Sequence, residues 1–322
     1  MATPGAESAV CGCIVCDCLV VTVCYTEQSG QLLVGLCYSE QLCVLGAVKG
    51  VTQLRDVVYV VTIRYEASGP SSTISRFNAT TQQRLADLVI RGFSRFPNDI
   101  AACELTSQLY VVDHCECVWR VSSDGVDIQR WLPKSPSDTF KPWTLSVTSS
   151  RLLVTSHHTD KQLRQFDAAG GDELRRVNLP DYIFPWHAVE SPTGTFIVDQ
   201  WNAQLGPSEV SEVSTEGQVL RQFSSSSLCS PEHIAVDRHG NIFVADRGTH
   251  RGNVIELYPG NGRILLLDAQ LSLRRVIIDA RQLNNRSRSV SATRNSPDNC
   301  WSGFITIASS RCLMCFGDRH SA

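Results

Sequence analysis

A chain of 322 residues with a formal net charge of −3 has no global excess of basic residues, because 29 lysines and arginines are balanced by 32 acidic residues. This balance excludes overall electrostatic attraction to nucleic acid or to an anionic membrane as the basis of function. A hydrophobic content of 43% is enough for a large core, and closed all-β folds of this length form one domain.

The N-terminal region is rich in cysteine. Seven of the 14 cysteines lie in the first 43 residues, and four of them, Cys11, Cys13, Cys16 and Cys18, fall within eight residues. They form one CxxC pair, and the other such pair, Cys312 with Cys315, is at the far end of the chain, so the close pairing of a zinc ribbon is missing. We interpret these thiols as structural and expect a reducing, cytoplasmic setting.

The same region is a poor match to a targeting segment. It lacks a basic start, and Asp17 interrupts its apolar stretch, which is too short to span a membrane. We therefore expect no membrane partner. Residues 1–19 are predicted to form a Cys-rich apolar segment outside the folded domain and are a candidate for disorder.

Four prolines recur at a nearly constant spacing of 45, 43 and 46 residues: Pro97, Pro142, Pro185 and Pro231. Each proline opens a short apolar segment, which is followed by a turn and a second apolar run. Self-similarity at a period in the forties, built from short strands, indicates blades of a β-propeller, whereas helical repeats of similar length would show a 3.6-residue apolar spacing.

One period can be divided into four strands. After Pro185 the apolar runs are 186–189, 195–199, 210–213 and 218–223, separated by turns that contain Gly194 and Gly217. Glycine accepts the positive φ that such tight turns need. Proline-free copies begin near Val51 and Val20, which brings the number of units to six.

The ring needs strands from both chain ends to close. Residues 288–322 lose the repeat, and 303–308 alone in that tail resembles a strand. We therefore predict an all-β, six-bladed propeller over residues 20–287 that is incompletely closed, followed by a divergent tail, 288–322, that is a second candidate for disorder.

The segment 230–246, SPEHIAVDRHGNIFVAD, resembles the NHL repeat, in which a proline precedes an apolar strand, a glycine turn and a strand that ends in aspartate. The resemblance implies a six-bladed NHL-type propeller, a fold used mostly to bind protein or RNA and occasionally to build an enzyme. Tripartite-motif ubiquitin ligases carry such propellers, but their RING finger, B-box and coiled coil are absent from this sequence. We therefore infer no ligase activity from the resemblance.

Two histidines occupy equivalent positions of adjacent repeats. His187 and His233 each lie two residues after the proline, and Asp99 and Thr144 occupy this position in the two preceding repeats. Inner strands line a propeller channel, so two imidazoles and a carboxylate would suit Zn²⁺, with Ca²⁺ as the second candidate. Peptide-amidating lyases are similar in placing histidines near such strands around zinc, but their histidine directly follows the proline. The alternative is that these polar side chains bind water or backbone.

Three aspartates, Asp113, Asp199 and Asp246, end equivalent second strands. They invite interpretation as a ring of catalytic carboxylates. We favour a structural role, because an aspartate at a strand end accepts backbone hydrogen bonds and fixes the following turn.

A second set of residues is a candidate binding surface. Trp143 and Trp186 directly follow their prolines, and Asn98 takes that place in a neighbouring repeat. Aromatic faces beside basic side chains suit a peptide or unpaired bases, and packing between blades is the alternative. The full set of candidate binding residues is Asn98, Trp143, Trp186, Arg247, His250 and Arg251.

The sequence contains no phosphate-binding loop, GxSxG elbow or HExxH helix. We therefore expect a non-enzymatic scaffold that recognises a protein, a peptide or RNA through one face of the propeller, without a cofactor. The alternative is a lyase or lactone hydrolase that depends on a metal held by His187, His233 and Asp99. Fold analogy alone identifies no ligand.

Overall fold

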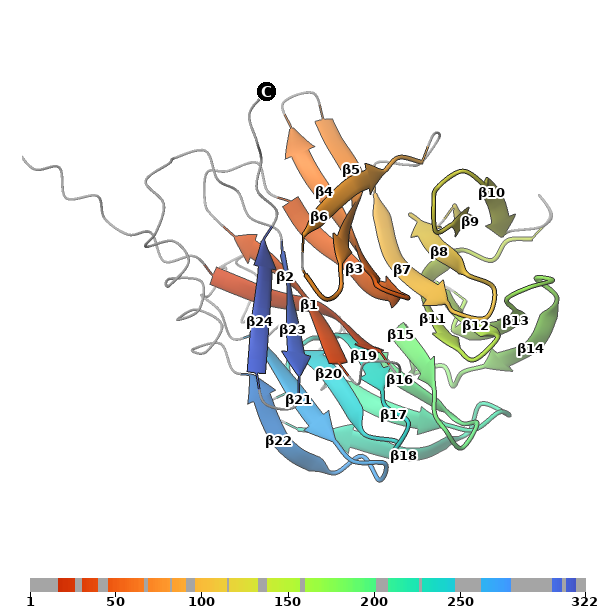
Figure 1. Cartoon of the computed structure of the whole chain (residues 1–322). Coiled ribbons are helices and arrows are strands. Elements are labelled where there is room, and N and C mark those ends of the chain that lie inside the picture. The colour runs from red at the N-terminus through yellow and green to blue at the C-terminus, as the bar shows by residue number, and fades with distance from the viewer. Residues whose placement is uncertain are drawn as a thin grey trace, which may run out of the picture.

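The chain folds as an all-β propeller, here described from a computed structural model (Figure 1). The structure describes residues 17–26, 31–39, 46–66, 69–81, 83–90, 96–114, 116–132, 138–156, 160–200, 208–225, 228–246, 262–278, 303–308 and 311–316. Strands and turns make up these ranges, and none of them holds a helix long and apolar enough to cross a membrane.

Five sheets each consist of four strands that are consecutive in sequence and pair in an antiparallel order. The first contains β3 (Gly46–Leu54), β4 (Val57–Glu66), β5 (Gly69–Asn78) and β6 (Arg84–Leu88), and the second β7 (Pro97–Cys103), β8 (Gln108–Asp113), β9 (Cys117–Ser122) and β10 (Ile128–Leu132). The third contains β11 (Pro142–Thr148), β12 (Arg151–Ser156), β13 (Gln162–Asp167) and β14 (Glu173–Asn178). The fourth contains β15 (Pro185–Glu190), β16 (Phe196–Gln200), β17 (Glu209–Val213) and β18 (Val219–Ser224), and the fifth β19 (Pro231–Val236), β20 (Ile242–Asp246), β21 (Arg263–Leu267) and β22 (Leu273–Ile278).

A further sheet is composite. It joins β1 (Asp17–Thr26) and β2 (Gln31–Ser39) to β23 (Gly303–Ala308) and β24 (Arg311–Phe316), and β2 pairs with β23. Its inner strand β1 contacts β19 on one side and β3 on the other, so it lies between the first and last of the five consecutive blades.

The expectation of six repeat-built blades therefore needs correction. The propeller architecture is confirmed, but five blades arise from consecutive strands, since the N-terminal copy near Val20 supplies a two-stranded hairpin and no more. A lone hairpin buries too little surface to be stable. The expected boundaries at residues 19 and 287 remain predictions, and two strands of the composite sheet lie beyond the second one.

The hydrophobic core lies between neighbouring blades. One buried cluster combines side chains of β7–β10 with those of β11–β13, and Trp131 in it makes edge-to-face contacts with Tyr110 and Phe166 at ring-centroid distances of 5.1 and 5.6 Å. Strands of the inner positions are buried on both faces, which explains their continuous runs of valine, leucine and isoleucine. The blades therefore stabilise one another across their faces.

Each blade-opening proline is followed by an irregularity that sets the register of the inner strand. The pairing of β7 with β8 skips from Pro97 to Asp99, and β15 and β19 skip in the same way to His187 and His233. The skipped residue is a β-bulge, which re-aims the side chain that follows it. The local geometry thus repeats at equivalent points of the ring.

The composite sheet generates a prediction about the tail. Removing residues 297–322 would deprive β2 of its partner β23, and the buried Leu33 lies in β2. We expect the melting temperature, followed by circular dichroism, to fall by at least about 5 °C, given roughly 2–4 °C per kcal/mol for a large domain. Removing residues 317–322 alone, which follow β24, is the control. Equal melting temperatures for the two truncations would contradict a role of β23 and β24 in closure.

Candidate site in the propeller channel

Three of the sequence candidates converge in the channel. Asp99 of β7, His187 of β15 and His233 of β19 are buried, and one potential ligand atom from each lies within 4.8 Å of the others. The Nε2 atom of His187 is 3.8 Å from Oδ2 of Asp99, and that of His233 is 3.5 Å from Oδ1. The arrangement brings two imidazoles and one carboxylate to a common point.

Backbone hydrogen bonds between blades hold two of these side chains. Asp99 accepts a hydrogen bond from the Ile100 amide through Oδ1, at 2.8 Å, and one from the Leu145 amide of the next blade through Oδ2, at 3.0 Å. The Ile234 amide donates to Nδ1 of His187 at 3.4 Å. Both side chains therefore connect one inner strand to the next.

Thr144 occupies the equivalent position between them and has the same structural role. Its hydroxyl donates to the carbonyl of Trp186 in the following blade, at 2.8 Å, and lies 2.7 Å from the hydroxyl of Thr155. Thr144 is not part of the three-residue cluster. Thr144 therefore fits the alternative in which a polar side chain of the channel binds backbone.

The two histidine rings are stacked, with centroids 3.6 Å apart and planes inclined by 27°. Burial, reinforced by the neighbouring His233 and opposed by a backbone carbonyl at Leu145, holds the pKa of His187 well below its ordinary value. His187 is therefore neutral at neutral pH. Because its Nδ1 accepts from Ile234, the neutral ring carries its hydrogen on Nε2.

His233 differs from its two neighbours. Within the described part of the chain, neither of its ring nitrogens has a hydrogen-bond partner, and both are buried. Among the described residues, its side chain is thus the one member of the cluster that makes no hydrogen bond between blades. A buried polar group in this state calls for an explanation, such as an ion or a water molecule.

Sequence reasoning missed Gly50, which holds the equivalent position in β3 after a skip from Val48. A Cβ atom there would lie 2.7 Å from the Ile100 amide nitrogen and 2.9 Å from Oδ1 of Asp99. Both distances are shorter than real Cβ contacts allow. Glycine therefore permits β7 and its carboxylate to approach β3, and a signal was present in the sequence, since Gly50 occupies the histidine position of its repeat.

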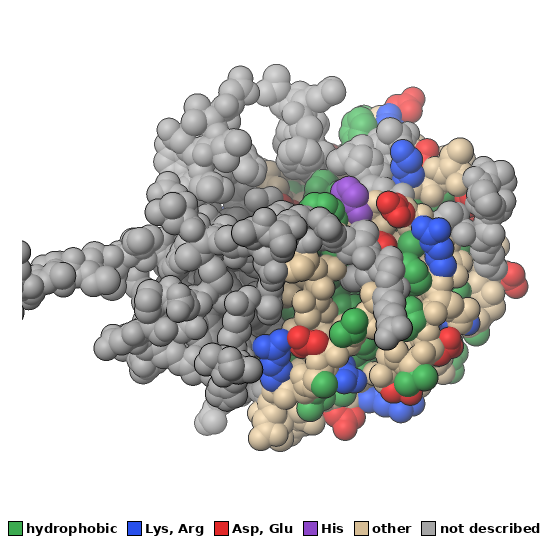
Figure 2. Space-filling model, turned by 90° about the horizontal axis from the view of Figure 1, so that it is seen from above, with side chains coloured by type: hydrophobic (Ala, Val, Ile, Leu, Met, Phe, Trp, Pro, Cys, Tyr) green, Lys and Arg blue, Asp and Glu red, His purple; other side chains and the backbone are tan. Residues whose placement is uncertain are grey.

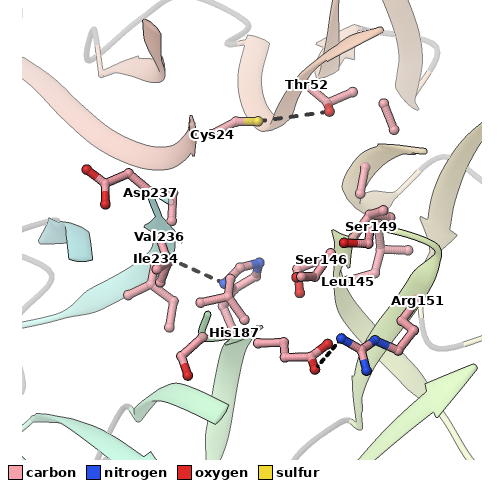
Figure 3. A pocket seen from close by; sticks show the side chains of 18 of the residues that line it. Cys24, Thr52, Leu145, Ser146, Ser149, Arg151, His187, Ile234, Val236 and Asp237 are labelled. Carbon is pink, nitrogen blue, oxygen red and sulfur yellow. Dashed lines mark hydrogen bonds and ion pairs between the residues drawn. The ribbon is translucent and has the colours of Figure 1, made fainter. Parts of the chain in front are cut away.

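A pocket of about 730 Å³ opens above the histidines and is lined by all six inner strands (Figure 3). His187 and His233 are at its floor, and its walls include Ile100, Leu145 and Ile234. Apart from the two histidines, the lining comes mainly from the middle and second half of each inner strand and from the turns that follow. The pocket therefore opens at the end of the channel opposite to the prolines.

The rim of the pocket is polar. Nη2 of Arg151 lies 2.8 Å from Oε1 of Glu190 (Figure 3). The other carboxylate oxygen of Glu190 accepts from the side-chain amide of Gln165 at 2.8 Å. Partial burial raises the pKa of Glu190 despite these partners. Lys and Arg side chains are interspersed with Asp and Glu over the described part of the surface shown in Figure 2, without a large area of one sign.

Cys24 of β1 also lines the pocket, 4.0 Å from the Thr52 hydroxyl (Figure 3). Burial raises the pKa of its thiol to about 11, so the thiol is protonated and weakly nucleophilic at neutral pH. The cluster of Cys11, Cys13 and Cys16 lies outside the described residues, as do the candidate binding residues Arg247, His250 and Arg251.

The remaining candidate binding residues lie at the other end of the inner strands. Trp143 and Trp186 are partly buried and pack edge to face at a centroid distance of 5.2 Å. Asn98 is also partly buried. None of the three lines the pocket. The structure thus separates the tryptophan pair from the histidine cluster.

The three strand-end aspartates have different partners. Asp113 accepts from the Trp119 indole at 3.0 Å, and Asp246 accepts from the Ser230 amide at 2.8 Å and pairs with Arg263 at 2.8 Å. Both arrangements agree with a structural role. Asp199 has no such cationic partner on the third strand of its blade, because Val210 is opposite Asp199 whereas Arg263 is opposite Asp246.

Asp199 accepts a hydrogen bond from the His187 amide through Oδ1, and its buried Oδ2 has no partner within the described residues. Burial, with added repulsion from Glu232 and Asp99, raises the pKa of Asp199 well above its ordinary value. The carboxyl group is therefore protonated in the folded protein at pH values where the unfolded chain has lost the proton.

Comparisons with known proteins support the fold. Residues 228–251 match the family model of the NHL repeat, which confirms the resemblance seen from Pro231 onward. Hydrazine synthase of Kuenenia stuttgartiensis is structurally similar, with a TM-score of 0.53 at 13% identity over 82% of this chain and 80% of that chain. The WD40 β-propeller domain of Doa1 has a TM-score of 0.48 at 14% identity, covering 70% and 75%, and the Dos1 propeller 0.48 at 11%, covering 82% and 84%.

At these identities the structural likeness concerns the fold alone. No curated protein sequence matches the chain significantly. The chain therefore carries an NHL repeat in a β-propeller, and its function has to be argued from the channel and the pocket.

The close contact at Gly50 yields a stability prediction. Gly50→Ala should destabilise the fold by about 1–3 kcal/mol, because the added methyl group overlaps the backbone of β7. Gly194→Ala is the matched control, since its φ is +82° but no atom lies within 4 Å of the added methyl group, so strain alone costs roughly 1 kcal/mol. Urea unfolding of both variants measures the difference. If Gly50→Ala loses less free energy of unfolding than Gly194→Ala does, β7 moves away from the added methyl group at little cost.

Asp199 yields a prediction about pH. Above the ordinary pKa of 3.8 the carboxyl group of the unfolded chain releases its proton while the folded protein retains it, so the folded state binds more protons and stability falls as pH rises. Asp199→Asn keeps the acceptor for the His187 amide and removes this dependence. The stability of the variant relative to wild type should therefore increase between pH 4 and pH 7, as measured by urea unfolding.

Asp246→Asn is the matched control for this experiment. Its carboxylate pairs with Arg263, so the substitution should lower stability at pH 7 by about 1–3 kcal/mol. If Asp199→Asn is as destabilising as Asp246→Asn at that pH, Asp199 is ionised in the folded state and the prediction is wrong.

Proposed function

We propose that this propeller is a binding module that accepts a segment of a polypeptide partner in the channel pocket. The observation that carries the proposal is the pocket of about 730 Å³, whose apolar walls stand between a polar rim and a floor of two histidines. Concave sites with apolar walls and a few convergent polar groups are the usual form of ligand sites. The fold itself is commonly used as a scaffold for protein binding.

The rim supports a peptide in preference to RNA. Arg151 and Arg238 are accompanied there by Glu104, Glu190 and Asp237. A polyanion would meet three carboxylates against two guanidinium groups, whereas single-stranded nucleic acid sites combine a positive groove with stacking aromatics. Phenylalanine, tyrosine and tryptophan are absent from the pocket lining within the described residues.

The polar groups of the rim also suit a peptide. Arg151 is paired with Glu190 but its side chain is 44% exposed, so a partner carboxylate can reach the guanidinium group. Serine and threonine hydroxyls on the rim, Ser149 and Thr193 among them, offer hydrogen bonds to a peptide backbone. An apolar side chain of the partner would pack against Leu145 and Ile234 on the walls.

The competing proposal of a metal-dependent lyase or lactone hydrolase places substrate in the same pocket. It requires a cation at His187, His233 and Asp99. Binding by the pocket does not depend on such an ion.

Selection from a random peptide display library on the immobilised protein tests the proposal, followed by fluorescence anisotropy with the enriched peptides. We expect Ser146→Phe, which fills the pocket from β11, to weaken binding at least about tenfold, and Arg151→Ala to weaken it by about 2–10-fold. Ser146 is a wall residue and Arg151 a rim residue in Figure 3.

Variants of the opposite end provide the contrast. Trp143→Ala and Trp186→Ala should change the affinity less than about twofold, since neither ring lines the pocket. If the tryptophan variants lose peptide binding and Ser146→Phe retains it, the binding face lies at the proline end of the channel. If the selection enriches no peptide and the protein binds a pool of single-stranded RNA, RNA is favoured as the partner.

A further inference from the structure

We infer that Asp99, His187 and His233 form a binding site for one divalent cation at the floor of the pocket, with Zn²⁺ as the ion that fits the donors best. The inference does not rest on the identity of the partner that the pocket binds. It concerns the three side chains whose potential ligand atoms lie within 4.8 Å of one another.

The first argument is the state of the imidazole nitrogens. Nε2 of His187 and both nitrogens of His233 are buried and have no hydrogen-bond partner within the described residues. Buried polar groups in folded proteins are almost always paired, and an unpaired one costs free energy. A cation between the rings and the carboxylate would give two of these nitrogens a partner.

The second argument is geometry. Four ligands at the usual zinc distances of about 2.0–2.1 Å stand roughly 3.4 Å apart in a tetrahedron. Nε2 of His233 is already 3.5 Å from Oδ1 of Asp99, and Nε2 of His187 is 3.8 Å from Oδ2. Small rotations of the side chains therefore suffice, and the inner strands need not separate.

The third argument is charge. Buried imidazoles that stack at 3.6 Å cannot both be protonated without strong repulsion, and the carboxyl group of Asp99 lies beside both rings. Neutral imidazole and carboxylate are ligands of zinc, whereas calcium takes oxygen ligands almost entirely. The donor set of two nitrogens and one carboxylate thus selects between the two ions considered from the sequence.

Binding at His187 requires one rearrangement. The hydrogen on Nε2 moves to Nδ1, because Nε2 must present its lone pair to the ion, and the Ile234 amide then loses its acceptor. That hydrogen bond is long, at 3.4 Å, so its loss costs less than that of a bond of ordinary length. The ring has to turn so that two N–H donors do not face each other, and the bonds to the ion have to offset the unpaired Ile234 amide. His233 needs no such exchange, since no hydrogen bond holds either of its nitrogens among the described residues.

Three protein ligands leave a coordination position open, as in zinc sites that bind a water molecule or a substrate. His187 and His233 line the pocket, so this position faces it. The ligand of that position would be an oxygen donor such as water or a carboxylate.

Cobalt(II) is the probe for the test, because its visible spectrum reports the ligands. The chain has 14 cysteines, and thiolates give cobalt an intense near-ultraviolet absorption that imidazole and carboxylate do not. The titration uses the full chain with Cys11, Cys13, Cys16 and Cys18 replaced by serine. We expect one equivalent of cobalt with a tetrahedral or five-coordinate spectrum without thiolate absorption, and a change of this spectrum on addition of acetohydroxamate, a small chelator that occupies the open position.

His233→Ala is the decisive variant, because it removes a ligand without removing a hydrogen bond among the described residues. We expect its cobalt affinity to fall at least about 100-fold, and that of His187→Ala similarly. His239→Gln, an exposed histidine of the same blade, is the control and should bind as wild type does. Asp99→Asn is less suitable, since both carboxylate oxygens accept backbone hydrogen bonds.

A second measurement needs no variant. In long-range nitrogen-15 spectra of the histidines, zinc should shift the resonances of two of the eight side chains and leave the others in place. The inference is overturned if no cobalt binds, if His233→Ala binds it as tightly as His239→Gln does, or if zinc shifts no histidine resonance. If acetohydroxamate leaves the cobalt spectrum unchanged, the bound ion has no open coordination position.

Discussion

The propeller depends on hydrogen bonds that pass from a side chain of one inner strand to the backbone of the next. Asp99 reaches the amide of Leu145, Thr144 reaches the carbonyl of Trp186, and His187 accepts from Ile234. The bulge after each opening proline aims these side chains toward the neighbouring blade and the channel at once. Asp99 and His187 therefore both hold adjacent blades together and give the channel its chemistry, so a substitution at either position changes both properties.

Local rules explain why so much of the fold could be predicted from sequence. The prolines at 97, 142, 185 and 231 open β7, β11, β15 and β19, and glycines with positive φ, such as Gly194 and Gly217, lie in turns between strands of one blade. Proline and glycine act through the φ angles of single residues, so their effect is visible without tertiary information. Equivalent positions in a repeat become neighbours in a ring, which is why His187, His233 and Asp99 were correctly expected on inner strands that share a channel.

Other features depend on which strands meet, and a single repeat does not contain that information. Gly50 matters because β7 approaches β3 closely, and the composite sheet depends on pairing between the two ends of the chain. The pocket opens at the end of the inner strands away from Trp143 and Trp186, a distinction that equal spacing from a proline does not reveal. Asp199 and Asp246 share a motif position and differ in their environment, because the residue opposite each lies on another strand.

The composite sheet also has a consequence for the order in which the protein is made. Val34 of β2 pairs with Ile305 of β23, so β2 waits for a strand that is synthesised after all five consecutive blades. Until then β2 presents an unpaired edge, and such edges favour association with other chains. Closing contacts between distant parts of a chain are also the slowest to form. A newly made chain would therefore depend most on chaperones after its five consecutive blades have emerged and before β23 and β24 leave the ribosome.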